Sequence, residues 1–190
     1  MERRVLLVRH GHHAEVGRVL SGRSDIALDA RGRAEAMAVA QHLAGTPIDR
    51  LFSSPRARTV DTALAFGEQV RVAAALDEVD FGTFTGRTFA ALDGDADWRR
   101  WNAERGSFRC PGGETMGEAV ARAVGFVAAL GVGVSVCVTH CDIIRGVVAH
   151  YLGLPLDRIF ALGCDPGSVT TLMLEGQGAR LATLNERPWP

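Results

Sequence analysis

The sequence predicts an α/β protein built as a three-layer αβα sandwich, in which helices cover both faces of a mostly parallel sheet. Short apolar runs rich in β-branched residues alternate along the chain with segments of helical periodicity, and this alternation is typical of parallel sheets. Residues 169–174 and 181–184 predict two final strands, joined across Gly176-Gln177-Gly178 as a hairpin, and hence an antiparallel closing strand. The 190 residues suffice for one well-filled core and not for two full domains. We therefore expect a single domain over residues 1–190, with a small lid-like insertion around 88–109.

The composition is that of an ordinary globular chain, with 47% apolar and 23% charged residues. A formal net charge of −1 provides no overall field for nucleic acid or an acidic membrane, so we expect neither partner. Every basic residue is arginine, which binds phosphate or carboxylate well, although genome composition gives the same bias. The four cysteines form no C-x-x-C pair and indicate reduced thiols in the cytoplasm. The apolar run after Arg3-Arg4 is too short for a signal segment, and no run approaches the length of a membrane span.

Two of the predicted strands run directly into a histidine. Residues 5–8 form a short buried strand that ends at Arg9 and His10, and residues 134–138 form a second one that ends at His140. Ligands bind beyond the carboxyl ends of the strands in an open α/β sheet. We therefore expect both imidazoles at one edge of the sheet, with His10 at the centre of the chemistry.

A polar, glycine-bearing loop over residues 12–25 follows the first strand and is expected to wrap one side of this site. Gly11 lacks a Cβ, so the backbone there can turn sharply and approach a ligand closely. His12 and His13 raise the question of a metal. They are adjacent on a loop and lack the spacing of metal ligands, so we expect no metal site.

The next elements are a helix, a strand and a second helix. The first helix covers residues 30–44 with Asp29 as its N-cap, and the strand covers 48–52 and delivers Ser53-Ser54-Pro55 to the same sheet edge. The second helix covers 56–66.

Arg56 and Arg58 lie in the first turn of the second helix, where a positive charge opposes the helix dipole. An anion bound between these arginines and the free N–H groups would explain them. A surface arginine pair is the alternative, and it fits Arg56 better than Arg58.

Residues 70–72 form a possible short strand, and three acidic residues follow it closely in the sequence. Asp77, Glu78 and Asp80 are separated by apolar residues, and any one of them could act as a general acid if it were partly buried near the site. Spacing alone does not choose between them.

The irregular stretch over residues 88–109 contains Trp98-Arg99-Arg100-Trp101. It fits either a lid or substrate wall, or a surface helix anchored by two tryptophans. A turn over 110–115 then starts a helix that ends at Gly131, residues 142–152 predict the last helix, and the tail after Asn185 is expected to be irregular.

Five motifs, in order, resemble those of the histidine phosphatase superfamily, also called the phosphoglycerate mutase-like family. The resemblance covers nearly the whole chain. The five are Arg9-His10-Gly11, Ser53-Ser54-Pro55-Arg56-Ala57-Arg58, Leu76-Asp77-Glu78-Val79-Asp80-Phe81-Gly82, Pro111-Gly112-Gly113-Glu114-Thr115 and Thr139-His140. The second motif selects Arg58 over Arg56, and the third selects Glu78 as the proton donor.

The resemblance implies a metal-independent mechanism without a cofactor. His10 would attack phosphorus and become a phosphohistidine, and Glu78 would protonate the leaving group. Arg9, Arg58 and His140 would surround the phosphoryl oxygens. We also expect substrate contacts from a further set of residues around the site: Gly11, His12, Ser21, Gly22, Thr139 and Cys141.

The chain departs from the family pattern at three places. His12-His13 replaces the usual Glu or Gln followed by Ser or Thr, no asparagine stands near Val16, and Cys141 replaces a common glycine. These departures leave the substrate contacts of the first loop, and the roles of His12 and His13, open.

The sequence favours a phosphatase acting on a small phosphomonoester. A phosphoglycerate mutase with the same phosphohistidine is the runner-up, and a non-catalytic phospholigand-binding member is the third reading. The short wall between Glu78 and Pro111 argues against the mutase, because a mutase must enclose its bisphosphate intermediate. The natural substrate and the oligomeric state, a homodimer included, remain open.

Overall fold

The computed structural model describes residues 3–176 and 178–189. Its centre is a six-stranded sheet in the order β3-β2-β4-β1-β5-β6. The strands are β1 (Arg3–Arg9), β2 (Arg50–Ser53), β3 (Val70–Val72), β4 (Gly133–Thr139), β5 (Val169–Glu175) and β6 (Gly178–Glu186). The first four strands are parallel, and β5 pairs antiparallel with both β1 and β6. The predicted sheet with its antiparallel closing strand is confirmed, while Gln177 of the predicted turn lies outside the described residues.

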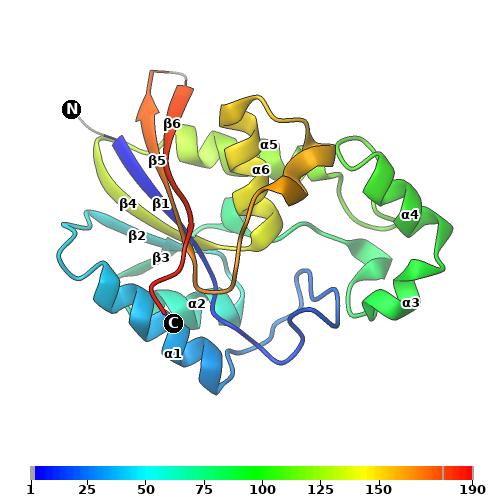
Figure 1. Cartoon of the computed structure of the whole chain (residues 1–190), viewed down its shortest axis with the longest axis horizontal. Helices are drawn as coiled ribbons and strands as arrows, with labels where there is room; N and C mark the ends of the chain where they lie inside the picture. Colours follow the sequence, from blue (N-terminus) through cyan, green and yellow to red (C-terminus); the bar gives the residue numbers. More distant parts are fainter. Residues whose placement is uncertain (1–2, 177, 190) are drawn as a thin grey trace.

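Helices cover both faces of the sheet, which confirms the predicted three-layer fold (Figure 1). Helices α1 (Ala30–His42) and α2 (Ala57–Leu64) lie on one face, and α5 (Met116–Ala128) and α6 (Cys141–Leu152) lie on the other. Because side chains alternate along a strand, β1 contributes to both cores. Its Leu6 and Val8 pack with Val39 of α1, while Leu7 belongs to the cluster that contains Val127 of α5.

Most predicted boundaries lie within a few residues of those observed. The Asp29 side chain caps α1 by accepting from the Gly32 N–H at 2.8 Å. Thr115 and Glu118 form a reciprocal capping box at the start of α5. Strand β6 is longer than expected, because its pairing with β5 continues to Glu186, so the irregular tail starts later than predicted.

The segment between residues 88 and 109 forms two short helices, α3 (Phe89–Asp93) and α4 (Ala96–Ala103), which lie to one side of the sheet (Figure 1). Trp98 and Trp101 of α4 stack with ring centroids 5.3 Å apart, and Trp101 is buried against Phe81 in the larger core. The segment is thus anchored by aromatic packing. The described residues also form short 3-10 helices at Ala74–Leu76, Gly82–Phe84 and Leu156–Ala161. Within the described ranges, none of the helices has the length and apolar character needed to cross a membrane.

Candidate active site

The two predicted histidines meet at the carboxyl ends of neighbouring parallel strands. Arg9 at the end of β1 is in register with Thr139 at the end of β4, and the His10 N–H donates to the Thr139 carbonyl at 3.0 Å. The ring centroids of His10 and His140 are 5.3 Å apart, and both side chains are buried. Strand register therefore brings the two imidazoles together, as predicted.

The hydrogen bond of His10 fixes which of its nitrogens carries the proton. Its Nδ1 lies 2.8 Å from the carbonyl of Gly11. A carbonyl only accepts, so Nδ1 holds the hydrogen and Nε2 has the free lone pair. Burial, and then the charges of Arg58 and Arg9, hold the pKa of His10 well below its usual value. A neutral imidazole with a free Nε2 is the form that can attack phosphorus.

The structure separates the two arginines of the α2 N-terminus. Arg56 binds Asp77 through Nε at 2.9 Å and Nη2 at 2.7 Å, so its role is an ion pair within the fold. Arg58 is buried and donates from Nη2 to the Nδ1 of His140 at 3.1 Å. It also donates to two carbonyls of the first loop, Gly22 at 2.5 Å and Ser24 at 2.7 Å. Arg58 thus joins the first loop to the second histidine.

His140 is oriented from both of its ring nitrogens. Since a guanidinium only donates, Nδ1 of His140 accepts from Arg58 and Nε2 carries the hydrogen. This Nε2 lies 2.7 Å from Oγ of Ser54, which in turn donates to Asp77 at 3.2 Å. Ser54 belongs to the Ser53-Ser54-Pro55 segment that the sequence predicts at this sheet edge. Burial, and then Arg58, hold the pKa of His140 well below its usual value.

Of the three candidate carboxylates, only Glu78 lines the cavity among the described residues. Asp77 is occupied by Arg56, and Asp80 accepts from Gly82 N–H at 3.0 Å and from Arg23 at 3.3 Å. Burial first, and then the negative charge of Asp142, raise the pKa of Glu78 to about 8. Glu78 is therefore protonated at neutral pH, which is the state a general acid needs.

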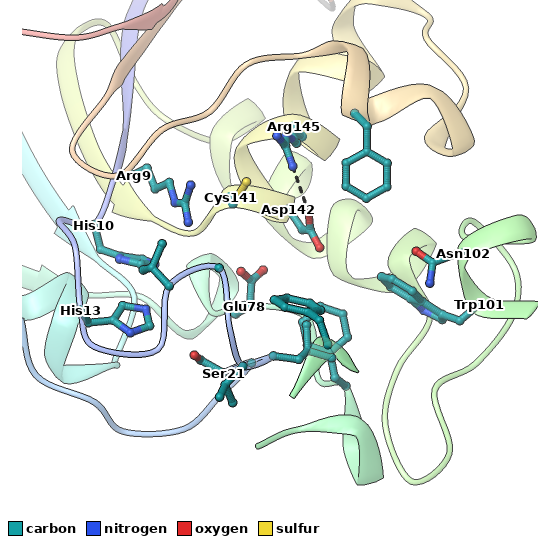
Figure 2. Close-up of a pocket in the computed structure, with 18 of the residues that line it drawn as sticks. Arg9, His10, His13, Ser21, Glu78, Trp101, Asn102, Cys141, Asp142 and Arg145 are labelled. Carbon is teal, nitrogen blue, oxygen red and sulfur yellow. Dashed lines mark ion pairs between the residues drawn. The ribbon is translucent and has the colours of Figure 1, made fainter. Parts of the chain in front are cut away.

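A cavity of about 220 Å³ is lined by His10 and Glu78, among others (Figure 2). His140 is fully buried and is not one of the described residues that line it. Ser21, Gly22 and Cys141, three of the expected substrate contacts, line it together with Arg9, Arg58 and Glu78. The remaining lining residues come from the end of β1, the first loop, the loop before Gly82, the 88–109 segment, α6 and the 3-10 turn that follows it. They are His10, His13, Val16, Gly17, Val19, Leu20, Phe81, Phe89, Trp98, Trp101, Asn102, Arg105, Asp142, Arg145 and Phe160.

Three expected substrate contacts face elsewhere: Gly11, His12 and Thr139. A Cβ on Gly11 would lie 2.3 Å from the Gly32 carbonyl oxygen, so its smallness serves the packing of α1 rather than the approach of a ligand. The Nδ1 of His12 lies 2.6 Å from Asp29. The hydroxyl of Thr139 donates to the carbonyl of Leu76 at 2.6 Å. None of these three is among the described residues that line the cavity, and each contacts a neighbouring segment instead.

The structure places His13, whose role the sequence leaves open, in the cavity. It is buried, lines the cavity, and its ring centroid lies 5.2 Å from that of His10 (Figure 2). Its Nδ1 accepts from the Glu15 N–H at 3.4 Å, which leaves the hydrogen on Nε2. Burial, followed by Arg58 and Arg9, lowers the pKa of His13 to about 4. His13 is therefore a neutral hydrogen-bond donor beside His10.

The far end of the cavity holds charged residues that the sequence motifs do not include. Asp142 and Arg145 lie three residues apart on α6 and line it together with Arg105, which follows α4. The spacing of Asp142 and Arg145, directly after His140, was the signal available. Among the residues that the structure describes, no group of three or more His, Cys, Asp or Glu side chains is arranged to hold a metal ion.

Comparison with known proteins gives concordant matches. A family model described as the histidine phosphatase superfamily (branch 1) matches residues 5–187. The chain is 28% identical over 194 residues to phosphoserine phosphatase 1 of Hydrogenobacter thermophilus, covering 96% of this chain and 92% of that protein. It is 32% identical over 196 residues to a glucosyl-3-phosphoglycerate phosphatase of Mycobacterium tuberculosis, covering 93% and 87%. A solved mycobacterial glucosyl-3-phosphoglycerate phosphatase superposes with a TM-score of 0.86 at 29% identity, covering 98% of this chain and all (100%) of that one.

Proposed function

The chain belongs to the histidine phosphatase superfamily, and we propose that it hydrolyses the phosphomonoester of a small metabolite through a phosphohistidine on His10. One arrangement carries this proposal. His10 has its Nδ1 bound to a carbonyl and its Nε2 free, and it shares a cavity with a carboxyl group, Glu78, whose pKa is raised to about 8.

In the first step, Nε2 of His10 forms a bond to phosphorus while the bond from phosphorus to the ester oxygen breaks. Glu78 gives its proton to the leaving alkoxide, so an alcohol departs and Glu78 becomes a carboxylate. In the second step, water attacks phosphorus, Glu78 takes a proton from that water, and the P–N bond breaks. Inorganic phosphate leaves, and both residues return to their starting states.

Hydrogen-bond donors around His10 hold the phosphoryl oxygens. Within the described part of the chain, Nε of Arg9 and Nε of Arg58 are buried without a hydrogen-bond partner. Unpaired buried donors are costly, and phosphoryl oxygens would satisfy them. We assign Arg9, Arg58 and the Nε2–H of His13 to this task, which needs no metal ion to supply the charge stabilisation. Both ring nitrogens of His140 are bound, to Arg58 and Ser54, so we assign His140 the positioning of Arg58.

The cavity favours a compact substrate. Its volume of about 220 Å³ lies below the roughly 300–1,000 Å³ of pockets that hold drug-sized ligands. Ser21, Gly22 and Cys141 line it and are proposed substrate contacts, while Trp98 and Trp101 of the 88–109 segment form a wall. We propose that the whole chain acts as one domain in which this segment is a wall of the site. The free thiols of the four cysteines agree with a cytoplasmic location.

Two alternatives were a mutase and a non-catalytic binding protein. The relatives described above are named as phosphatases, which favours hydrolysis over isomerisation. The protonated state of Glu78 favours catalysis over binding alone, because a binding site gains nothing from a general acid.

Phosphate release tests the proposal. The wild type is assayed in EDTA against a panel of phosphomonoesters, with His10→Ala as the inactive control. Hydrolysis by the wild type that is absent from His10→Ala supports the phosphohistidine mechanism. Equal activity of both proteins, or activity that EDTA removes, contradicts it. Conversion of a phosphoglycerate to its isomer without phosphate release identifies a mutase.

A further inference from the structure

The cavity has a second cationic end, lined by Arg105 and Arg145 on either side of an ion-pair partner, Asp142. Figure 2 shows Arg145 and Asp142 of this end. Glu78 lies between this end and the histidines. Arg105 is fully buried, and its guanidinium lies 4.1 Å from the Trp101 ring and 4.3 Å from the Phe160 ring. Stacking on two aromatic rings holds the guanidinium plane in one orientation.

Arg105 has a buried donor that the described residues leave unsatisfied, and Arg145 is held by the fold through Nε. Arg105 donates from Nη2 to Asn102 at 2.5 Å, and within the described residues its buried Nε has no partner. Arg145 donates from Nε to the carbonyl of Leu162 at 2.9 Å. The contacts of Asp142 with the two Nη1 atoms are 3.8 and 3.9 Å long, which is beyond hydrogen-bond distance.

The charges of this end select the kind of ligand. Two guanidinium groups and one carboxylate leave one net positive charge, because arginine stays protonated even when buried. A monoanion neutralises this charge. A second phosphate dianion would exceed it and would also face the repulsion of Asp142. A neutral hydroxyl would leave buried donors without a charged acceptor.

We propose that Arg105 and Arg145 bind a carboxylate of the substrate, so that the enzyme acts on small phosphomonoesters that carry a carboxylate group. This inference rests on the proposed phosphatase function and adds the substrate class. Planar guanidinium groups suit a carboxylate, since both present paired atoms in a plane. The phosphoryl group lies at His10, and the carboxylate lies at the arginine end.

Two substrate pairs that differ only at the carboxylate test the proposal. One pair is 3-phosphoglycerate and glycerol 3-phosphate, and the other is O-phosphoserine and O-phosphoethanolamine. We expect the wild-type kcat/KM to be roughly 10- to 100-fold higher for the carboxylate member of each pair, as for a charge-assisted hydrogen bond. Equal values within the pairs, or a preference for fructose 1,6-bisphosphate over all four, would overturn the proposal.

The variant Arg145→Gln tests whether the preference for carboxylate-bearing substrates comes from the arginine end of the cavity. Its ratio of kcat/KM for 3-phosphoglycerate over glycerol 3-phosphate is expected to fall roughly tenfold or more. Because the ratio is measured on one protein preparation, a partial loss of folded enzyme cancels out. The exposed Arg158 of the neighbouring 3-10 turn provides the control, and Arg158→Gln is expected to keep the wild-type ratio. An unchanged ratio in Arg145→Gln would contradict the assignment.

A separate substrate keeps this test apart from that of the phosphatase function. p-Nitrophenyl phosphate carries no carboxylate group. Its hydrolysis by the wild type and not by His10→Ala therefore measures the phosphatase activity independently of the proposed carboxylate site. Activity on this substrate with no preference in either pair would refute the carboxylate site and leave the phosphatase in place. If the wild type hydrolyses neither p-nitrophenyl phosphate nor any member of the two pairs, the proposed phosphatase function itself is refuted.

Discussion

The negative charge of Asp142 adds to burial in raising the pKa of Glu78 to about 8. The two residues reach the same cavity from different elements, Glu78 from the loop before Gly82 and Asp142 from the first turn of α6. Glu78 thereby keeps its proton at neutral pH, which the first step requires.

This relationship predicts the pH dependence. The wild-type kcat/KM is expected to fall as the pH rises through about 8, because Glu78 then loses the proton that it must donate. In Asp142→Asn the repulsion disappears, the pKa of Glu78 falls, and the basic limb moves to lower pH. The pH profile with glycerol 3-phosphate checks this, with the exposed Asp157→Asn as control. If the activity of Asp142→Asn falls at the same pH as that of the wild type, the ionisation of Glu78 is not the cause of the loss at high pH.

The leaving group tests the role of Glu78 more directly. Glu78→Gln is expected to slow alkyl phosphates by roughly a hundredfold or more, because an alkoxide leaves poorly without a proton. Aryl phosphates such as p-nitrophenyl phosphate should slow much less, because their leaving groups are stable anions. The measurement is the hydrolysis rate of Glu78→Gln relative to that of the wild type on both kinds of ester. Equal slowing of both would show that Glu78 is not the proton donor.

His13 is expected to act as a donor to the phosphoryl group. His13→Ala should lower kcat/KM roughly 10- to 100-fold, the usual cost of losing a hydrogen bond to a charged group. His13→Gln should keep more activity, since its side-chain amide offers an N–H donor. His42, which pairs with Glu186 on the outside of the fold, gives the matched control His42→Ala. Activity of His13→Ala equal to that of His42→Ala would show that His13 only fills space.

Gly11 is predicted to matter for stability through the contact of the first loop with α1. In Gly11→Ala the new methyl group meets the Gly32 carbonyl at 2.3 Å, and such overpacking costs about 1–3 kcal/mol. The Tm should fall by roughly 2–10 °C for a chain of this size. Gly45→Ala is the control, because no atom lies within 4 Å of its added Cβ. Thermal unfolding of both variants in parallel measures the effect, and equal Tm values would contradict the contact.

The sequence predicts the sheet and the central histidines well for a physical reason. Strand ends are marked by a change from apolar to polar residues, and parallel strands place their ends together, so His10 and His140 could be paired without coordinates. Glu78 was only one of three carboxylates on spacing alone. Burial singles it out, and burial depends on packing between distant segments.

The direction of side chains in the first loop was beyond prediction. His12 and His13 are adjacent and chemically alike, yet His12 turns to Asp29 and His13 turns to the cavity. The loop backbone at Gly11 also packs against Gly32 of α1, a contact between residues 21 positions apart. Arg105 was missed for a similar reason, because its burial depends on Phe160, which is distant in sequence.

The central claim is a covalent phosphohistidine on His10, and trapping it is the most direct measurement. The wild type is mixed with substrate labelled in its phosphoryl group, quenched in alkali, in which phosphohistidine is stable, and digested for mass spectrometry. The account predicts a phosphoryl group on the peptide that contains His10, and none in His10→Ala. Phosphate release during turnover with no phosphorylated His10, or phosphorylation of His13 or His140 instead, would contradict it.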